Sequence, residues 1–275
     1  MQLAISNIAL PAYDHAGLFP RLRELGLTGL EVAPSRAWEN MEQGPSAHDV
    51  DIYRRAVERA GLTVVGLHSL FWQVPDLGLF RAPQARAQTL DFLVRLSALC
   101  RDLGGRTLIY GSAPARRRGA LSREAAISEA VRFFNDLCPR IESHGTCFCF
   151  EPLGPEDSDF VNSAFESLTI VRAVGHPALR VQLDAKALVA NSEVSPDVFR
   201  TTAPYLVHFH ANEPDLGIVG SSGKVDHGLL GRMLNDVGYK SFVSIEQRML
   251  SQENAMSDIE TSAAALRHCY GGYGA

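Results

Sequence analysis

The chain has 275 residues, of which 46% are hydrophobic, so it can bury one large core as a single barrel-sized domain. A formal net charge of −5 provides no general attraction to phosphate backbones or anionic membranes, so we expect neither nucleic acid nor membrane partners. The N-terminus carries no basic-then-apolar signal segment, and no uninterrupted apolar run approaches the ~20 residues that span a bilayer. Five cysteines, an odd number lying mostly in helix-like or strand-like runs, favour reduced thiols. Together these features predict a cytoplasmic protein.

Strand-like and helix-like segments alternate through the first half of the chain. The sequence predicts strands over 3–9, 27–32, 62–68 and 107–110. It predicts helices over 18–25, 47–60 and 83–103. Glycine follows each of these helices, at Gly26, Gly61 and Gly104, where a left-handed cap is commonly required.

The second half repeats the same order. A helix over 123–143 leads into an apolar strand that ends at Glu151, where Pro152 prevents a regular continuation of the ladder. The remaining strands are predicted over 179–184, 205–210 and 242–246, and the remaining helices over 164–174, 196–205, 229–237 and 258–269. Eight strand-helix units favour a closed, single-domain (β/α)8 TIM barrel over an open doubly wound sheet.

Phosphate-binding motifs are missing from this pattern. No GxGxxG follows the first strand and no GxxxxGK[ST] loop occurs, so nucleotide binding by either route lacks support. Two long connections, 33–47 and 214–225, are rich in glycine, proline and serine. Because they exceed the usual few residues, we expect them to be active-site loops.

Four consecutive predicted strands end on residues that bind metals, namely Glu151, Asp184, His210 and Glu246. In an eightfold βα barrel the C-terminal ends of the strands meet at one mouth, so these side chains can share one ion. Three carboxylates and one imidazole form a hard ligand set. We therefore predict one divalent ion, Mn²⁺ first, with Mg²⁺, Co²⁺ or Zn²⁺ as alternatives. Strand alternation also turns a lower layer of side chains into the barrel, namely those of Cys147, Cys149, Gln182, His208 and Ser244.

The chain resembles the xylose isomerase-like barrels, a family of sugar phosphate isomerases/epimerases. It includes ketose epimerases, hydroxypyruvate isomerase, inosose dehydratase and the apurinic-site endonucleases. The resemblance covers nearly the whole chain and rests on Gly29-Leu-Glu31, Phe150-Glu-Pro-Leu153, Leu183-Asp184, His210-Ala-Asn-Glu213, Val225-Asp-His227 and Ser244-Ile-Glu246. It implies that Glu151, Asp184, His210 and Glu246 bind a divalent ion. As in the epimerases, Glu151 and Glu246 would flank the substrate carbon as the catalytic pair.

The sequence departs from the family pattern in two places. Many members carry Asp-x-x-His after strand six, where the histidine contacts substrate, whereas here Asp184 is followed by Ala185-Lys186-Ala187. Lys186 either replaces that contact or lies on the barrel exterior. The endonucleases have a metal-binding histidine after strand four, whereas this chain has Tyr110-Gly-Ser112, so we do not expect a trinuclear zinc cluster.

Further candidates for substrate binding lie at or beyond the ends of strands two, three and eight. Glu31 and His68 end strands two and three. The aromatic residues that follow, Trp38, Phe71 and Trp72, either wall a sugar pocket or pack as core beneath a loop. Arg248 either holds a substrate oxygen or anion or forms a surface ion pair.

These features predict a divalent-metal-dependent isomerase or epimerase of a carbohydrate-like α-hydroxy ketone or aldehyde, acting through an enediolate. The nearest alternative is a metal-dependent dehydratase of a keto-sugar or inosose, which would use the same enediolate to expel water. A nucleic-acid phosphodiesterase is disfavoured by the acidic balance, and a non-catalytic binding protein is a further alternative. A small carbohydrate is the expected partner, and the sequence leaves a homo-oligomer open.

Overall fold

The computed structural model of the chain describes residues 1–272. Its parallel strands form a closed barrel in chain order, in which β1 is hydrogen-bonded to both β2 and β8. The strands are β1 (Gln2–Ser6), β2 (Gly29–Val32), β3 (Thr63–Leu67), β4 (Thr107–Tyr110), β5 (Cys147–Phe150), β6 (Leu179–Asp184), β7 (Leu206–Ala211) and β8 (Phe242–Ile245). The predicted TIM barrel is therefore confirmed.

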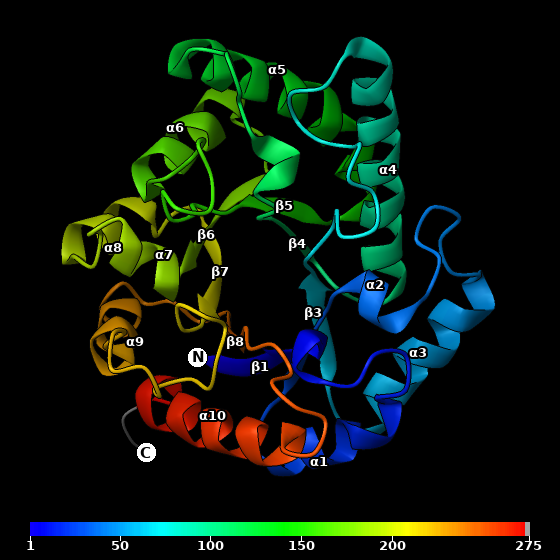
Figure 1. Ribbon diagram of the computed structural model, residues 1–275, viewed down its shortest axis with the longest axis vertical. Helices are drawn as coiled ribbons and strands as arrows, with labels where there is room; N and C mark the ends of the chain where they lie inside the picture. The colour runs from blue at the N-terminus through cyan, green and yellow to red at the C-terminus, as the bar shows by residue number, and fades with distance from the viewer. Residues whose placement is uncertain (273–275) are drawn as a thin grey trace.

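Helices surround the strands as an outer ring (Figure 1). The α-helices are α1 (Phe19–Glu24), α2 (Pro34–Ala37), α3 (Ala47–Arg59), α4 (Pro83–Asp102), α5 (Arg123–Ile141), α6 (Ala164–Val174), α7 (Ala185–Ala190), α8 (Pro196–Thr202), α9 (His227–Asp236) and α10 (Ala255–Tyr270). Short 3-10 turns occupy Asn7–Ala9, Ala16–Leu18, Pro114–Arg116 and Glu142–His144. The last helix lies beside the first, where Arg21 Nη2 meets Glu260 Oε1 at 2.5 Å, so the two ends of the ring are joined.

An aromatic cluster shows how the strands pack against the helices. Tyr110 of β4 and Phe150 of β5 point outward and contact Phe134 of α5, with ring centroids 5.6 and 5.3 Å from it. All three side chains are fully buried. Successive side chains of a strand point to opposite faces, so Glu151, the residue after Phe150, points to the inner side of the barrel. The same segment therefore supplies both core packing and a site residue.

The structure corrects several predicted boundaries. The first strand ends at Ser6 rather than Ala9, because the Ser6 side chain accepts from Ile8 N at 3.1 Å and begins a 3-10 turn. The seventh strand runs one residue later than predicted, over Leu206–Ala211. The short helices α2 and α7 were not predicted, since neither is long enough to show a helical period.

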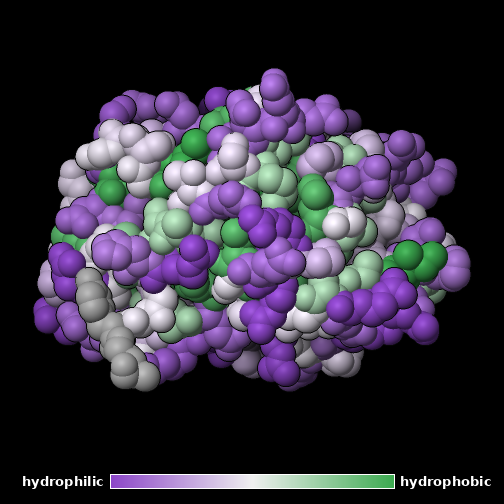
Figure 2. All heavy atoms as spheres, turned by 90° about the horizontal axis from the view of Figure 1, so that it is seen from below, coloured by the Kyte–Doolittle hydropathy of each residue, from purple (hydrophilic) through white to green (hydrophobic). Residues whose placement is uncertain are grey.

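The outer surface is mixed in polarity. Figure 2 shows one face, on which hydrophobic residues lie in small groups among hydrophilic ones. Across residues 1–272, no helix combines the length and the hydropathy needed to cross a membrane. The five cysteines are free thiols.

Helix α3 begins with a capping box that makes a testable contribution to stability. Ser46 Oγ accepts from Asp49 N at 3.2 Å, and Asp49 Oδ2 accepts from Ser46 N at 3.3 Å. Ser46→Ala should therefore lower the free energy of unfolding by about 1 kcal/mol, measured by urea denaturation. Ser128→Ala, at an exposed position inside α5, is the matched control. Equal stability of the two variants would contradict a capping role.

Candidate metal and substrate site

A cavity of about 620 Å³ opens at the C-terminal ends of the strands. The four predicted metal ligands line it, so the structure brings them together. Glu151 follows β5, Asp184 ends β6, His210 lies in β7 and Glu246 follows β8. Consecutive strands of one barrel therefore supply the four side chains, as the strand-end pattern predicts.

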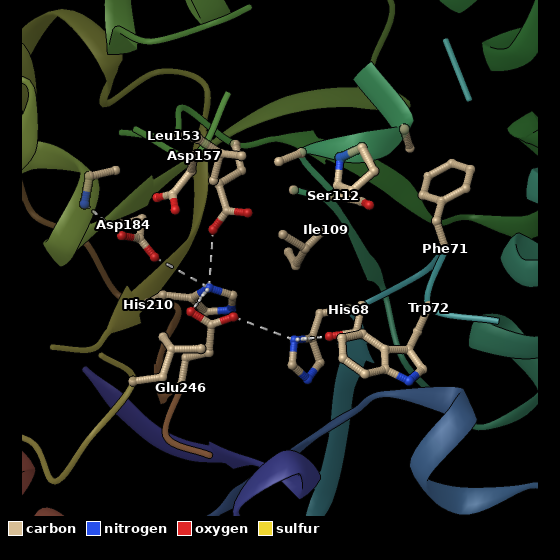
Figure 3. Close-up of a pocket in the computed structure, with 18 of the residues that line it drawn as sticks. His68, Phe71, Trp72, Ile109, Ser112, Leu153, Asp157, Asp184, His210 and Glu246 are labelled. Atoms are coloured by element: carbon tan, nitrogen blue, oxygen red, sulfur yellow. Dashed lines mark hydrogen bonds and ion pairs between the residues drawn. The ribbon is translucent and has the colours of Figure 1, made fainter. Parts of the chain in front are cut away.

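The ligand atoms converge on one nitrogen. His210 Nδ1 lies 3.2 Å from Glu151 Oε1, 3.5 Å from Glu246 Oε2 and 3.8 Å from Asp184 Oδ2 (Figure 3). This buried nitrogen has no hydrogen-bond partner of suitable geometry within the described chain. Atoms of Glu151, Asp184 and His210 all lie within 4.8 Å of one another, a spacing suited to one ion. An unpartnered buried imidazole nitrogen among carboxylate oxygens fits a divalent cation.

The charges at this point also favour a cation. Burial and the negative charges of Glu151 and Glu246 raise the pKa of Asp184 well above its usual range. Burial would lower the pKa of His210, but the nearby carboxylates of Glu31 and Glu246 raise it well above its usual range. Burial would raise the pKa of Glu246, but His210 and His68 hold it below its usual range. The cluster therefore stabilises positive charge at its centre.

Glu31 lies beneath His210 and does not line the cavity. Its Oε2 accepts from His210 Nε2 at 3.0 Å and from Ser244 Oγ at 2.9 Å, and its Oε1 lies 3.2 Å from His208 Nε2. Burial would raise the pKa of Glu31, but the charges of His210, His208 and His68 hold it well below its usual range. A carboxylate that binds one imidazole nitrogen leaves the other free for an ion. The structure thus places Glu31 to orient a ligand.

Two amides orient the carboxylates. Gln182 Nε2 donates to Glu151 Oε1 at 2.7 Å, and Asn212 Nδ2 donates to both Asp184 Oδ2 at 2.6 Å and Glu246 Oε2 at 2.7 Å. Sequence reasoning placed Gln182 inside the barrel but missed Asn212. Its spacing of two residues from His210 was the available signal, because alternate residues of a strand share a face.

Removing the Asn212 amide should weaken metal binding. Asn212→Ala leaves two carboxylates without a common donor, so we expect the Kd for Mn²⁺ to rise about 10- to 100-fold, as for other residues that orient ligands. Competition with a fluorescent chelator measures this. Asn235→Ala, at an exposed position in α9, is the control. An unchanged Kd in Asn212→Ala would show that the backbone alone holds the carboxylates.

Aromatic and polar residues form the cavity walls. Figure 3 shows Phe71 and Trp72 across the cavity from Asp184 and His210. The Trp72 side chain is at the rim and is 79% exposed. His68 also lines the cavity, with Nδ1 3.8 Å from Glu246 Oε1 and Nε2 2.5 Å from Ser6 Oγ. The residues predicted as a substrate wall after β3 therefore line this cavity.

Lys186 lines the cavity and so does not lie on the barrel exterior. Its Nζ is 2.9 Å from Asp157 Oδ2, and its backbone N donates to Asn212 Oδ1 at 2.9 Å. Asp157 was not predicted, because it lies in the irregular connection between β5 and α6 and follows no strand or helix period.

Two predicted substrate contacts lie away from the cavity lining. Trp38, the residue after α2, packs against Tyr53 of α3, with ring centroids 5.2 Å apart. Arg248 is exposed, and its backbone N donates to Leu216 O at 2.9 Å.

The loops at the mouth differ from those predicted. The connection 33–47 contributes no lining residue, whereas 214–225 contributes Leu216. Much of the lining comes instead from residues 68–77, after β3, and 111–115, after β4. Segment 68–77 contains the apolar run Leu70-Phe71-Trp72, which resembles core sequence. Its composition therefore did not indicate a loop that lines the cavity.

Comparison with known proteins agrees with this geometry. Residues 19–269 match the family model described as xylose isomerase-like TIM barrel. D-psicose 3-epimerase of Ruminiclostridium cellulolyticum is 27% identical over 241 residues, covering 85% of this chain and 78% of that protein. A Mus musculus protein provisionally named hydroxypyruvate isomerase is 31% identical over 252 residues, covering 88% of each. The crystal structure of D-psicose 3-epimerase with D-tagatose from Clostridium cellulolyticum H10 superposes with a TM-score of 0.81 at 20% identity, covering 98% of this chain and 99% of that one.

Proposed function

The chain belongs to the xylose isomerase-like TIM barrel family, and on that premise we propose that it is a divalent-metal-dependent isomerase or epimerase of a carbohydrate-like α-hydroxy ketone or aldehyde. The observation that carries this proposal is the convergence of three carboxylates on the unpartnered Nδ1 of His210, inside a cavity. We propose Mn²⁺ as the ion, since oxygen donors dominate the set. We also place the enzyme in the cytoplasm, in keeping with its free thiols.

The chemistry needs an acidified carbon and a base beside it. A bound ion would draw electron density from the carbonyl and neighbouring hydroxyl oxygens of the substrate, making the proton on the carbon between them easier to remove. Glu151 and Glu246 are the candidate bases, since both line the cavity. Gln182 fixes one carboxylate and Asn212 the other, so each base is held in place before substrate binds.

The two glutamates come from different strands, which allows two outcomes. One carboxylate removes the proton, giving an enediolate, and the other returns a proton from its own side. Return to the same carbon from the opposite face inverts the centre, which is epimerisation. Return to the neighbouring carbon, with the hydroxyl proton passing to the former carbonyl oxygen, moves the carbonyl, which is isomerisation. The aromatic faces of Phe71 and Trp72 would pack against the C–H groups of the substrate.

Turnover in D₂O tests the proposal directly. The Mn²⁺-loaded protein is incubated with ketoses, inososes and hydroxypyruvate, and the products are examined by NMR. We expect deuterium on the carbon beside the carbonyl, because carboxylate bases exchange their protons with solvent. Product free of solvent deuterium would indicate hydride transfer instead, and loss of water from the substrate would indicate the dehydratase.

The relatives differ in the charge of the compound for which they are named. Psicose is an uncharged ketose, whereas hydroxypyruvate carries a carboxylate. The proposed reaction is chemically open to both, so the residues that face the substrate must decide between them.

A further inference from the structure

We infer that the cavity selects an uncharged substrate, and that Asp157 enforces this selection by neutralising Lys186. The inference rests on the proposed function and adds the charge class of the substrate to it. It also assigns a specificity role to Asp157, whose carboxylate belongs to neither the ligand set nor the catalytic pair.

The first observation is that Lys186, a basic side chain in the cavity wall, is already paired with a carboxylate. In the described part of the chain, Lys186 is the only lysine or arginine that lines the cavity. Its Nζ lies 2.9 Å from Asp157 Oδ2, and the two side chains are 27% and 37% exposed. The Lys186 ammonium is therefore already paired with a carboxylate of the chain. A phosphate or carboxylate would have to displace Asp157 to use this charge.

The second observation is the negative charge of the remaining lining. Glu151, Asp184 and Glu246 all face the cavity. With Asp157 they make four carboxyl groups against the one ammonium of Lys186 among the described residues that line the cavity. An anionic substrate group would therefore enter a field of its own sign, which a neutral polyol would not experience.

A buried arginine near the end of β5 binds the backbone instead. Arg116 is fully buried and does not line the cavity. Its Nη1 donates to the backbone carbonyls of Glu151 and Tyr110, so its position fixes the chain at the end of β5. Its Nε and Nη2 are buried and have no hydrogen-bond partner in the described chain, but Arg116 does not line the cavity.

The third observation concerns the loop after β7, where barrel enzymes commonly bind phosphate. Residues 217–224 have the glycine, serine and lysine content of a phosphate loop. Here an internal carboxylate takes the donors: Gly220 N donates to Glu213 Oε1 at 2.7 Å, and Ser222 Oγ donates to Glu213 Oε2. Glu213 is 2% exposed and also meets His227 Nε2 at 3.0 Å. The loop is thus already bound to an anion of the chain itself.

Binding measurements can test the inference without relying on turnover. The chain has two tryptophans, and Trp38→Phe leaves Trp72, at the cavity rim, as the only indole reporter. In this background, the Mn²⁺-loaded protein is titrated with D-fructose and with D-fructose 6-phosphate at equal free Mn²⁺. We expect the phosphate to bind at least about tenfold more weakly than the uncharged sugar. Hydroxypyruvate serves as a second anionic probe.

Asp157→Asn separates charge from size. Asparagine has nearly the same shape as aspartate, so any steric rejection of the phosphate would stay the same while Lys186 loses its partner. We expect the Kd for D-fructose 6-phosphate, divided by the Kd for D-fructose, to fall about tenfold in this variant. This is the size of one charge-assisted hydrogen bond. Asp159→Asn, in the same connection, is the control, because Asp159 binds the backbone N of Arg118 and Gly119 and does not line the cavity.

The outcomes distinguish this inference from the proposed function. Tighter binding of the phosphate by the wild-type cavity, or an unchanged ratio in Asp157→Asn, overturns the inference. Selective binding of D-fructose without deuterium exchange on any substrate would support the inference and count against the proposed function. Faster deuterium exchange on hydroxypyruvate or D-fructose 6-phosphate than on every uncharged ketose would support the proposed function and overturn the inference.

Discussion

Glu246→Gln should lower turnover by at least about 10²-fold at saturating Mn²⁺, the usual effect of losing a general base. Glutamine keeps the shape of the side chain and can still accept from Asn212 Nδ2, which lies 2.7 Å from Glu246 Oε2. What it loses is the ability to take a proton. Glu151→Gln should behave likewise, since Gln182 holds Glu151 Oε1 at 2.7 Å in the same manner. The initial rate of deuterium incorporation measures both.

Saturating metal is essential, because each glutamate is also a candidate ligand. A variant that only binds the ion more weakly recovers its rate when Mn²⁺ is raised, whereas lost proton transfer is not restored. Glu253→Gln, an exposed carboxylate in the connection between β8 and α10, should leave the rate unchanged. If Glu246→Gln kept the wild-type rate with its ion bound, the base would have to be another group, and His68, which lines the cavity with its Nδ1 3.8 Å from Glu246 Oε1, is a candidate.

The fold and the convergence of the four candidate ligands at one mouth could be predicted because both depend on the regular repeat of strands and helices. Parallel strands alternate their side chains and end at one mouth, so Glu151 and Asp184 were placed by counting along their strands. The same count placed Gln182 and Ser244 below them, where they now contact carboxylates.

Residues at strand irregularities or in irregular connections could not be placed by counting along a strand or helix. The pairing of β2 with β3 shifts its register between Leu30 and Glu31, an irregularity that no sequence pattern marks. Glu31 lies within β2, one residue before the strand ends, and so sits below His210 rather than facing the cavity. Asp157 lies in an irregular connection, and its contact with Lys186 depends on how that connection folds over the mouth.

Asp184→Ala and His210→Ala should each reduce bound metal from about one ion per chain to nearly none, because each removes one of the four candidate ligands. The barrel should remain folded. Asp184 also caps α7, since its Oδ1 accepts from Ala187 N at 2.8 Å, so Asp184→Ala costs about 1 kcal/mol of stability in addition. Asp184→Asn, which retains an acceptor for the cap but loses the charge, should release the ion with a smaller loss of stability.

Elemental analysis with circular dichroism separates loss of the ion from loss of the fold. In His210→Ala the buried Glu31 keeps its contacts with Ser244 and His208, so its charge is not left without partners. Asp215→Ala and His268→Ala remove the same two residue types at exposed positions and should keep their metal. Wild-type metal content in both Asp184→Ala and His210→Ala would exclude this site. A second group of ligand atoms also converges, those of Glu31, His68 and His210. This group is intact in Asp184→Ala but not in His210→Ala. Metal loss in the histidine variant alone would therefore indicate that the ion binds to this second group.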